Sequence, residues 1–161
     1  APQPSKKPRT KKLISARPAV RKRRPLLESS AMNRLLKIIA IIEAPTGLVL
    51  IVVPGLMVHL LLNADISGAA IPLARIAGVA LLALGVACWL AGHDVHSRAA
   101  RGVVSAVTIY NVGAALVLGA AGLQMQPTGI ALWPAVIGHA GMAVWCVATL
   151  FSNDKNQEIS L

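Results

Sequence analysis

The residues of this sequence that could do chemistry are a few polar side chains set within long apolar stretches. They are Glu43, Arg75, Tyr110, Asn111 and His139. A carboxylate, a phenol and an imidazole exchange protons, and with an amide they can hydrogen-bond a small polar group. In an apolar environment such side chains are costly unless they are paired, so together they predict either a binding site or a structural cluster.

Glu43 is the most informative of the five. In a helix beginning at Leu35, the rise of 1.5 Å per residue places it roughly 12 Å below the edge of a bilayer. Asn111 lies equally far into a later stretch that would run in the same direction. We therefore predict one polar centre, which would be a proton-sensitive, quinone-binding or small-solute site. A hydrogen-bond cluster that only fixes helix register is the simpler interpretation, and the sequence alone favours it.

The elements that must position these residues are four apolar stretches of the length that a spanning helix needs, about 20 residues. They are residues 35–53, 71–91, 103–123 and 130–151. The chain is 55% hydrophobic and 14% charged, whereas a soluble domain carries about 25% charged residues. We predict an all-α integral membrane four-helix bundle over residues 32–152.

Small residues and a helix break add detail to this bundle. Pro54 and Gly55 interrupt the first apolar stretch, so residues 56–62 either continue as a kinked helix or bend into the membrane interface, and we favour the bend. Glycine recurs at positions 78, 85 and 92, a spacing that predicts close packing of helix backbones.

The first 31 residues differ from the rest of the chain. They hold ten of the sixteen Lys and Arg residues, five prolines and a single acid, Glu28. We predict a disordered basic tail that is attracted to anionic lipid headgroups. Nucleic acid is a less favoured partner because the tail has no aromatic residues. Residues 153–161 form a second, short polar tail.

The distribution of bases predicts orientation. Basic residues precede the first stretch, lie at Arg98 and Arg101 between the second and third, and follow the fourth at Lys155. Both termini are therefore predicted to be cytoplasmic, in a bacterial inner membrane, with an organellar membrane as the alternative. The tail is either a native or over-extended start upstream of Met32, which we favour, or a transit segment.

Signatures of catalysis and of metals are missing from the sequence. It contains no nucleophile elbow, zinc-protease motif or phosphate-binding loop, so we predict a protein that is not an enzyme. Cys88 and Cys146 are far apart and are predicted to be buried apolar residues. Haem and metal sites built from the histidines are disfavoured, and quinone is the one cofactor that we consider.

One segment carries a family resemblance. Residues 73–85 (LARIAGVALLALG) resemble the DoxX-like group of small bacterial four-helix membrane proteins, and the similarity extends over about residues 33–151. The resemblance implies a four-helix membrane fold. It also implies a link to membrane redox complexes, with which some members are associated.

Three functions follow as expectations. The first is a small, non-enzymatic accessory or structural subunit of a membrane assembly, with other membrane subunits or copies of itself as partners. The second, which the resemblance supports, is a quinone-binding or electron-transfer component with Glu43, Arg75 and His139 near the bound group. The third is a proton-coupled or small-solute conduit that uses the same polar centre.

Overall fold

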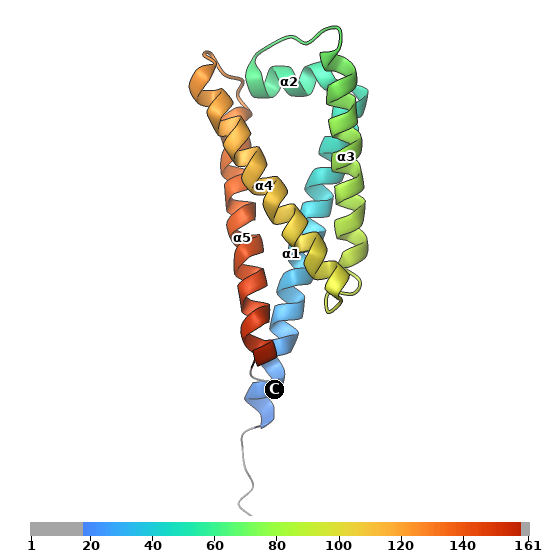
Figure 1. The fold of residues 1–161 in the computed structure, drawn as a ribbon, viewed down its shortest axis with the longest axis vertical. Coiled ribbons are helices and arrows are strands. Elements are labelled where there is room, and N and C mark those ends of the chain that lie inside the picture. The colour runs from blue at the N-terminus through green and yellow to red at the C-terminus, as the bar shows by residue number, and fades with distance from the viewer. Residues whose placement is uncertain (1–17, 159–161) are drawn as a thin grey trace, which may run out of the picture.

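The described part of the protein is all-helical. The computed structural model describes the backbone of residues 18–158 and the side chains of residues 30–152. The five helices, labelled in Figure 1, are α1 (Pro18–Val52), α2 (Pro54–Leu62), α3 (Ala70–Ala91), α4 (Arg98–Gln124) and α5 (Leu132–Glu158). Four of them contain segments long and apolar enough to cross a membrane: Ser30–Val52, Ala70–Ala91, Arg98–Gln124 and Leu132–Ser152. The prediction of four helices at these places that are long and apolar enough to span a membrane is confirmed.

Helix extends into both predicted tails. Because α1 begins at Pro18, residues 18–31 are helical, which corrects the prediction of disorder for them. Leucine, arginine and alanine in this segment favour helix, and the spanning helix that follows supplies turns from which it can propagate. At the other end α5 continues to Glu158. The prediction of disorder for residues 1–17 lies outside the described residues.

The break at Pro54 produces a separate helix. Proline lacks the N–H that would continue the hydrogen bonds of α1, and Val53 leaves the helical region with φ −130° and ψ 63°. In Figure 1, α2 then lies across the end of the molecule, at a steep angle to α1 and α3. This confirms the prediction that residues 56–62 bend away and do not continue α1.

The long helices form two pairs. In the first pair, the backbones of α1 and α3 come into close contact at glycine. A Cβ added at Gly78 would lie 2.7 Å from the carbonyl oxygen of Gly47, and one added at Gly85 would lie 2.9 Å from the Cβ of Ala44. The predicted small-residue packing is thus confirmed at Gly78 and Gly85. Helices α4 and α5 form the second pair (Figure 1).

The two pairs are joined at both ends by different means. Near the loop between α3 and α4, they share an apolar core of buried residues, among them Leu36, Ile39, Cys88, Val104, Val107 and Cys146. Both cysteines are buried and free, as predicted. At the opposite end the backbone N–H groups of Gly129 and Ala131 donate to carbonyl oxygens at the end of α2, at 3.1 and 2.9 Å.

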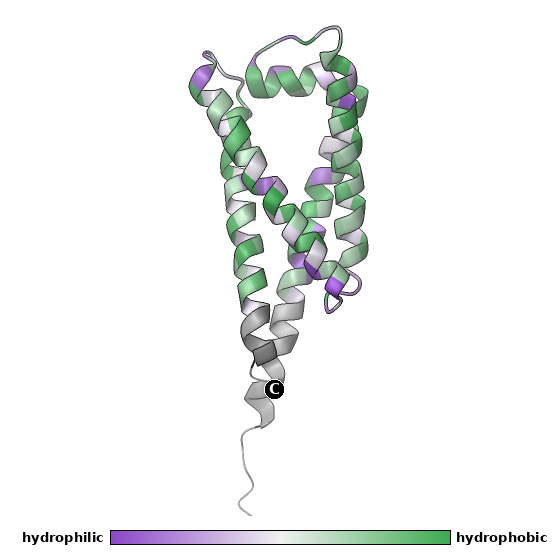
Figure 2. Cartoon of the chain, in the orientation of Figure 1, coloured by the Kyte–Doolittle hydropathy of each residue, from purple (hydrophilic) through white to green (hydrophobic). Residues whose placement is uncertain are grey.

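Between these two joints the helix pairs diverge (Figure 1). Figure 2 shows that the helices are mainly hydrophobic along their length, and that hydrophilic residues gather in the loops and in a few mid-helix positions. Those mid-helix positions are where a functional site must be sought.

We predict that Gly78→Ala destabilises the protein by about 1–3 kcal/mol, the usual range for overpacking. The added methyl group would contact backbone atoms of α1, which cannot move aside as a side chain does. Thermal unfolding in detergent measures the loss. Gly141→Ala is the matched control, since a Cβ there meets nothing within 4 Å. Equal stability of the two variants would show that the α1–α3 contact is looser than described.

Candidate functional site

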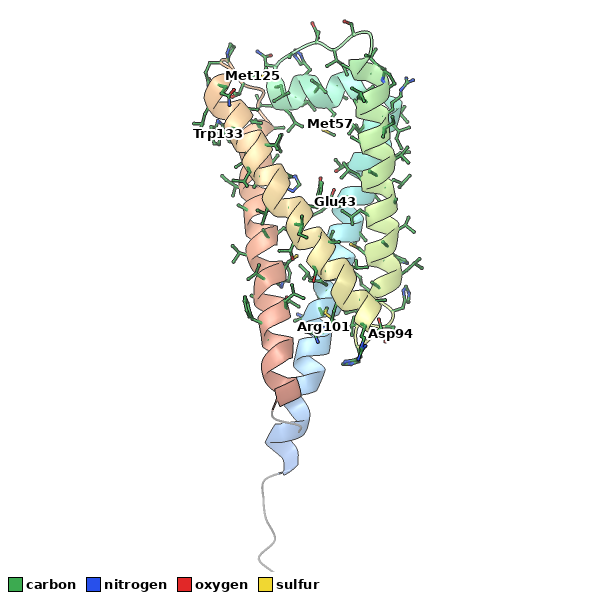
Figure 3. The ribbon with its side chains drawn as sticks, in the orientation of Figure 1. Glu43, Met57, Asp94, Arg101, Met125 and Trp133 are labelled. Atoms are coloured by element: carbon green, nitrogen blue, oxygen red, sulfur yellow. The ribbon has the colours of Figure 1, made fainter. Side chains whose placement is uncertain are left out.

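A polar cluster lies where the helix pairs begin to diverge. Figure 3 shows Glu43 of α1 in the space between α1 and α4, with Met57 of α2 facing the same space from the far end. Glu43 is only 5% exposed, and its carboxyl group lies beside the Tyr110 hydroxyl. A buried acid of α1 is thus adjacent to a polar side chain of α4.

The other half of the cluster joins α4 to α5. His139 Nδ1 lies 2.9 Å from Asn111 Oδ1, and Asn111 is 1% exposed. The ring of Tyr110 meets the ring of His139 edge-on, with centroids 5.6 Å apart and an interplanar angle of 83°. Four of the five residues singled out from the sequence are therefore brought together, from three helices.

The cluster rests directly on the apolar core. Glu43, Asn111 and His139 each lie four residues, or about one turn, from a buried apolar residue on the same helix: Ile39, Val107 and Ala143. The core therefore forms one layer and the polar side chains form the next. This stacking gives the cluster a defined depth. The apolar layer fixes how the three helices meet, so the polar residues one turn further along them lie close to one another.

Helix α1 continues through the proline near Glu43. Pro45 lies inside α1, although it cannot donate to the turn before it. The hydroxyl of Thr46 donates to the carbonyl oxygen of Ile42, at 2.7 Å.

Hydrogen bonding fixes the orientation of the groups in the cluster. The amide nitrogen of Asn111 lies 2.9 Å from the carbonyl oxygen of Val107, which can only accept. The Asn111 oxygen must then face His139, and His139 Nδ1 must carry a proton to donate to it. In the neutral imidazole, which an apolar environment favours over the cation, Nε2 holds a lone pair and is an acceptor.

His139 Nε2 reaches the surface of the chain. Among residues 30–152, Asn33 Oδ1 is the one buried side-chain polar atom that lacks a hydrogen bond. The interactions of His139 with the described residues are those of Nδ1 with Asn111 and of the ring with Tyr110. Nε2 therefore has no partner among residues 30–152 and is not buried by them, although His139 lies well inside the spanning segment Leu132–Ser152.

Arg75 is the predicted site residue that the structure leaves apart. It is exposed on α3, near the end where α2 lies. Ala44, next to Glu43 in the sequence, contacts Gly85 of α3, so Glu43 lies near the level of Gly85. Gly85 is ten residues further along α3 than Arg75. At 1.5 Å per residue this is a separation of about 15 Å along the helix, so Arg75 does not join the cluster.

His59 and His93, which were considered as ligands of haem or of a metal, lie outside the polar cluster. His59 pairs with Asp65 at 3.8 Å in an exposed region, and His93 Nδ1 donates to the carbonyl oxygen of Trp89 at 3.0 Å. No group of three His, Cys, Asp or Glu side chains suited to a metal ion is found among the described residues.

The structure also adds a residue that the sequence did not single out. Met57 faces the diverging region from α2 (Figure 3). The sequence signal for it was weak, because its position depends on α2 folding across the molecule, which a hydropathy pattern does not specify.

Comparisons with family models, with curated proteins and with solved structures find no match. The resemblance to the DoxX-like group therefore stays a prediction.

Proposed function

We propose that this chain is a small integral membrane protein, a four-helix bundle, that binds the polar headgroup of an amphipathic, quinone-type molecule at Tyr110 and His139, beside the buried Glu43. The observation that carries the proposal is the ring nitrogen Nε2 of His139, which lies inside a spanning segment, is not buried and has no hydrogen-bond partner among the described residues. In hydrocarbon an exposed polar atom without a partner is costly, so a polar group from outside the chain is expected to cover it.

The members of the cluster differ in burial. Glu43 and Asn111 are buried. Asn111 holds His139 in place through a hydrogen bond, and Glu43 lies beside Tyr110. Tyr110 and His139 are only partly buried, so a headgroup can reach them. The DoxX-like resemblance supports the same ligand class, since some members of that group are associated with membrane redox complexes.

His139→Phe should weaken the binding of a short-chain benzoquinone or of its benzoquinol about tenfold. This is the effect of losing one hydrogen bond of roughly 1.4 kcal/mol. Phenylalanine keeps the ring that packs on Tyr110 and removes both nitrogens. Calorimetric titration of the detergent-solubilised full chain measures the affinity, with thermal unfolding as a check of folding.

His93→Phe is the matched control, because His93 lies outside the spanning segments and contacts Trp89. It should bind as the wild type does. A folded His139→Phe variant with unchanged affinity for both redox forms would rule out the proposed site.

We further propose that both termini face the cytoplasm, in a bacterial inner membrane, with an organellar membrane as the alternative. Three chain segments gather at one end of the structure (Figure 1): the start of the spanning part of α1, the loop between α3 and α4, and the end of that part of α5. Arg34 and Lys37 lie in the first of these segments, and Arg98 and Arg101 lie in the first turn of α4, directly after the second. Such bases favour the cytoplasmic side.

Thiol labelling of whole cells tests this orientation. With a membrane-impermeant reagent, Ser67→Cys, in the exposed loop before α3, should be labelled, and His96→Cys, in the exposed loop before α4, should be protected until the cells are opened. The native cysteines are buried and should give little background. Reversed labelling would invert the proposed orientation.

A second candidate is an accessory subunit of a membrane assembly. It is favoured by the outer face of α3, where large apolar side chains are exposed over most of the helix: Leu73, Ile76, Val79 and Leu90. Lipid can cover this face equally well, which is why ligand binding is our first proposal.

Purification in a mild detergent tests this second candidate. A partner subunit seated on α3 should co-purify with the wild type and be lost in Ile76→Trp, because the larger side chain would separate the two surfaces. Ile137→Trp is the matched control on α5, where Ile137 is 70% exposed. A chain that always runs alone would exclude this candidate.

A further inference from the structure

Basic residues gather at the end of the structure where α3 is joined to α4. Arg34 and Lys37 lie there on α1, and Arg98 and Arg101 lie in the first turn of α4. Figure 3 places Arg101 and Asp94 at this end, and Asp94 is the one acid that residues 30–152 contribute to it. This end of the described bundle therefore carries an excess of positive charge.

The packing of α1 against α3 sets the level of these bases. Asn33 Oδ1 would lie 3.7 Å from a Cβ added at Gly92, the residue that caps α3. From there towards the middle of the span, Lys37 is four residues or roughly 6 Å further along α1, and Trp89 is three residues or roughly 4.5 Å further along α3. Trp89 is 48% exposed, and tryptophan is enriched at the membrane interface. Lys37 and Trp89 therefore lie at nearly the same level, near the edge of a bilayer.

Three of the bases are open to the surroundings. Arg34, Lys37 and Arg98 are exposed and form no ion pair with another residue of the described segment 30–152. Arg101 is half-buried and adds its charge close by. Long basic side chains at the border of the hydrocarbon keep their charged heads in the polar headgroup layer, so these heads are expected to lie among lipid headgroups.

Apolar side chains continue the same surface towards the middle of the span. Arg34, Lys37 and Ile41 follow one another at spacings of three and four residues, which places them on one face of α1. Ile41 is 62% exposed, and on α3 Leu90, beside Trp89, is 65% exposed. A molecule that covers this surface must present a negative group to the bases and apolar chains to the adjoining part of the helices.

We infer that this end of the bundle binds anionic phospholipids, with the phosphate against Arg34, Lys37 and Arg98 and the acyl chains on the apolar surface beside them. Nucleic acid or an acidic protein would match the bases only. The arginine fork can hold two phosphate oxygens at once, and lysine adds a point charge. The surface belongs to the folded bundle and not to the first 31 residues, and it is independent of the ligand site at His139.

Quenching of tryptophan fluorescence by brominated lipid measures lipid contact at a chosen residue. The full-length chain is reconstituted into phosphatidylcholine bilayers that contain brominated phosphatidylglycerol or, for comparison, brominated phosphatidylcholine. Trp133→Phe with Trp145→Phe leaves Trp89 as the reporter at the basic end, and Trp89→Phe with Trp145→Phe leaves Trp133 as the reporter at the other end (Figure 3). We expect phosphatidylglycerol to be preferred about tenfold at Trp89 and not to be preferred at Trp133.

Substitution of the bases tests whether the bundle itself sets this preference. Lys37→Gln combined with Arg98→Gln should lower the preference at Trp89 by about fivefold or more, because each base near the surface contributes roughly a fivefold preference. Lys37→Arg with Arg98→Lys keeps both charges and should keep the preference. Arg75→Gln is the matched control, since Arg75 is an exposed base of a spanning helix near the opposite end, and it should change nothing at Trp89.

Raised salt provides a test that needs no substitution of a base, should a variant fail to fold. Concentrated salt screens exposed charges, so the preference at Trp89 should fall towards equality. The absence of any preference at Trp89 would overturn the inference. A preference that the Lys37→Gln and Arg98→Gln pair leaves unchanged would also overturn it, and would assign the attraction to the first 31 residues. An equal loss in Arg75→Gln would overturn it as well, since a base at either end would then serve.

Discussion

The close contact of α1 with α3 determines the rest of the described structure. Alanine and glycine at positions 44 and 47 let the two backbones touch, and this contact fixes which side of α1 faces α3. The adjacent stripe of α1, made of Leu36, Ile39 and Glu43, is thereby turned towards the second helix pair, where the first two join the shared core and the third meets Tyr110. The position of the one acid buried in α1 thus follows from small residues beside it in the sequence.

Much of this architecture could be predicted from the sequence, because the relevant forces are local. A run of about 20 apolar residues is sufficient for a spanning helix, and the missing N–H of Pro54 is sufficient to end one. The grouping of Glu43 with Asn111 could also be foreseen, since equal distance along two parallel helices means equal depth. His139 was placed by the same argument, from the middle of the last stretch.

Other features depend on how distant segments pair, which hydropathy does not encode. Arg75 is long enough to reach inwards, but it is exposed and lies about 15 Å along α3 from the level of Glu43. The hydrogen bonds from Gly129 and Ala131 join the loop between α4 and α5 to the end of α2, through backbone groups that nearly every residue carries. The extension of α1 back to Pro18 was missed because charge and proline content outweighed helix propensity in the prediction.

The choice between a structural cluster and a binding site turns on whether the polar groups satisfy one another. A cluster that only fixes register gains most when every donor and acceptor is paired inside the protein. Here both polar ends of the Asn111 side chain are used internally, whereas His139 is paired on one side of its ring and has no partner among the described residues on the other. The paired side fixes the direction of the ring, and the open side is an acceptor held in place at mid-span. A group that is positioned but unpaired in this way is better suited to recognise a ligand than to stabilise the fold, so the geometry favours a site where the sequence alone favoured a structural cluster.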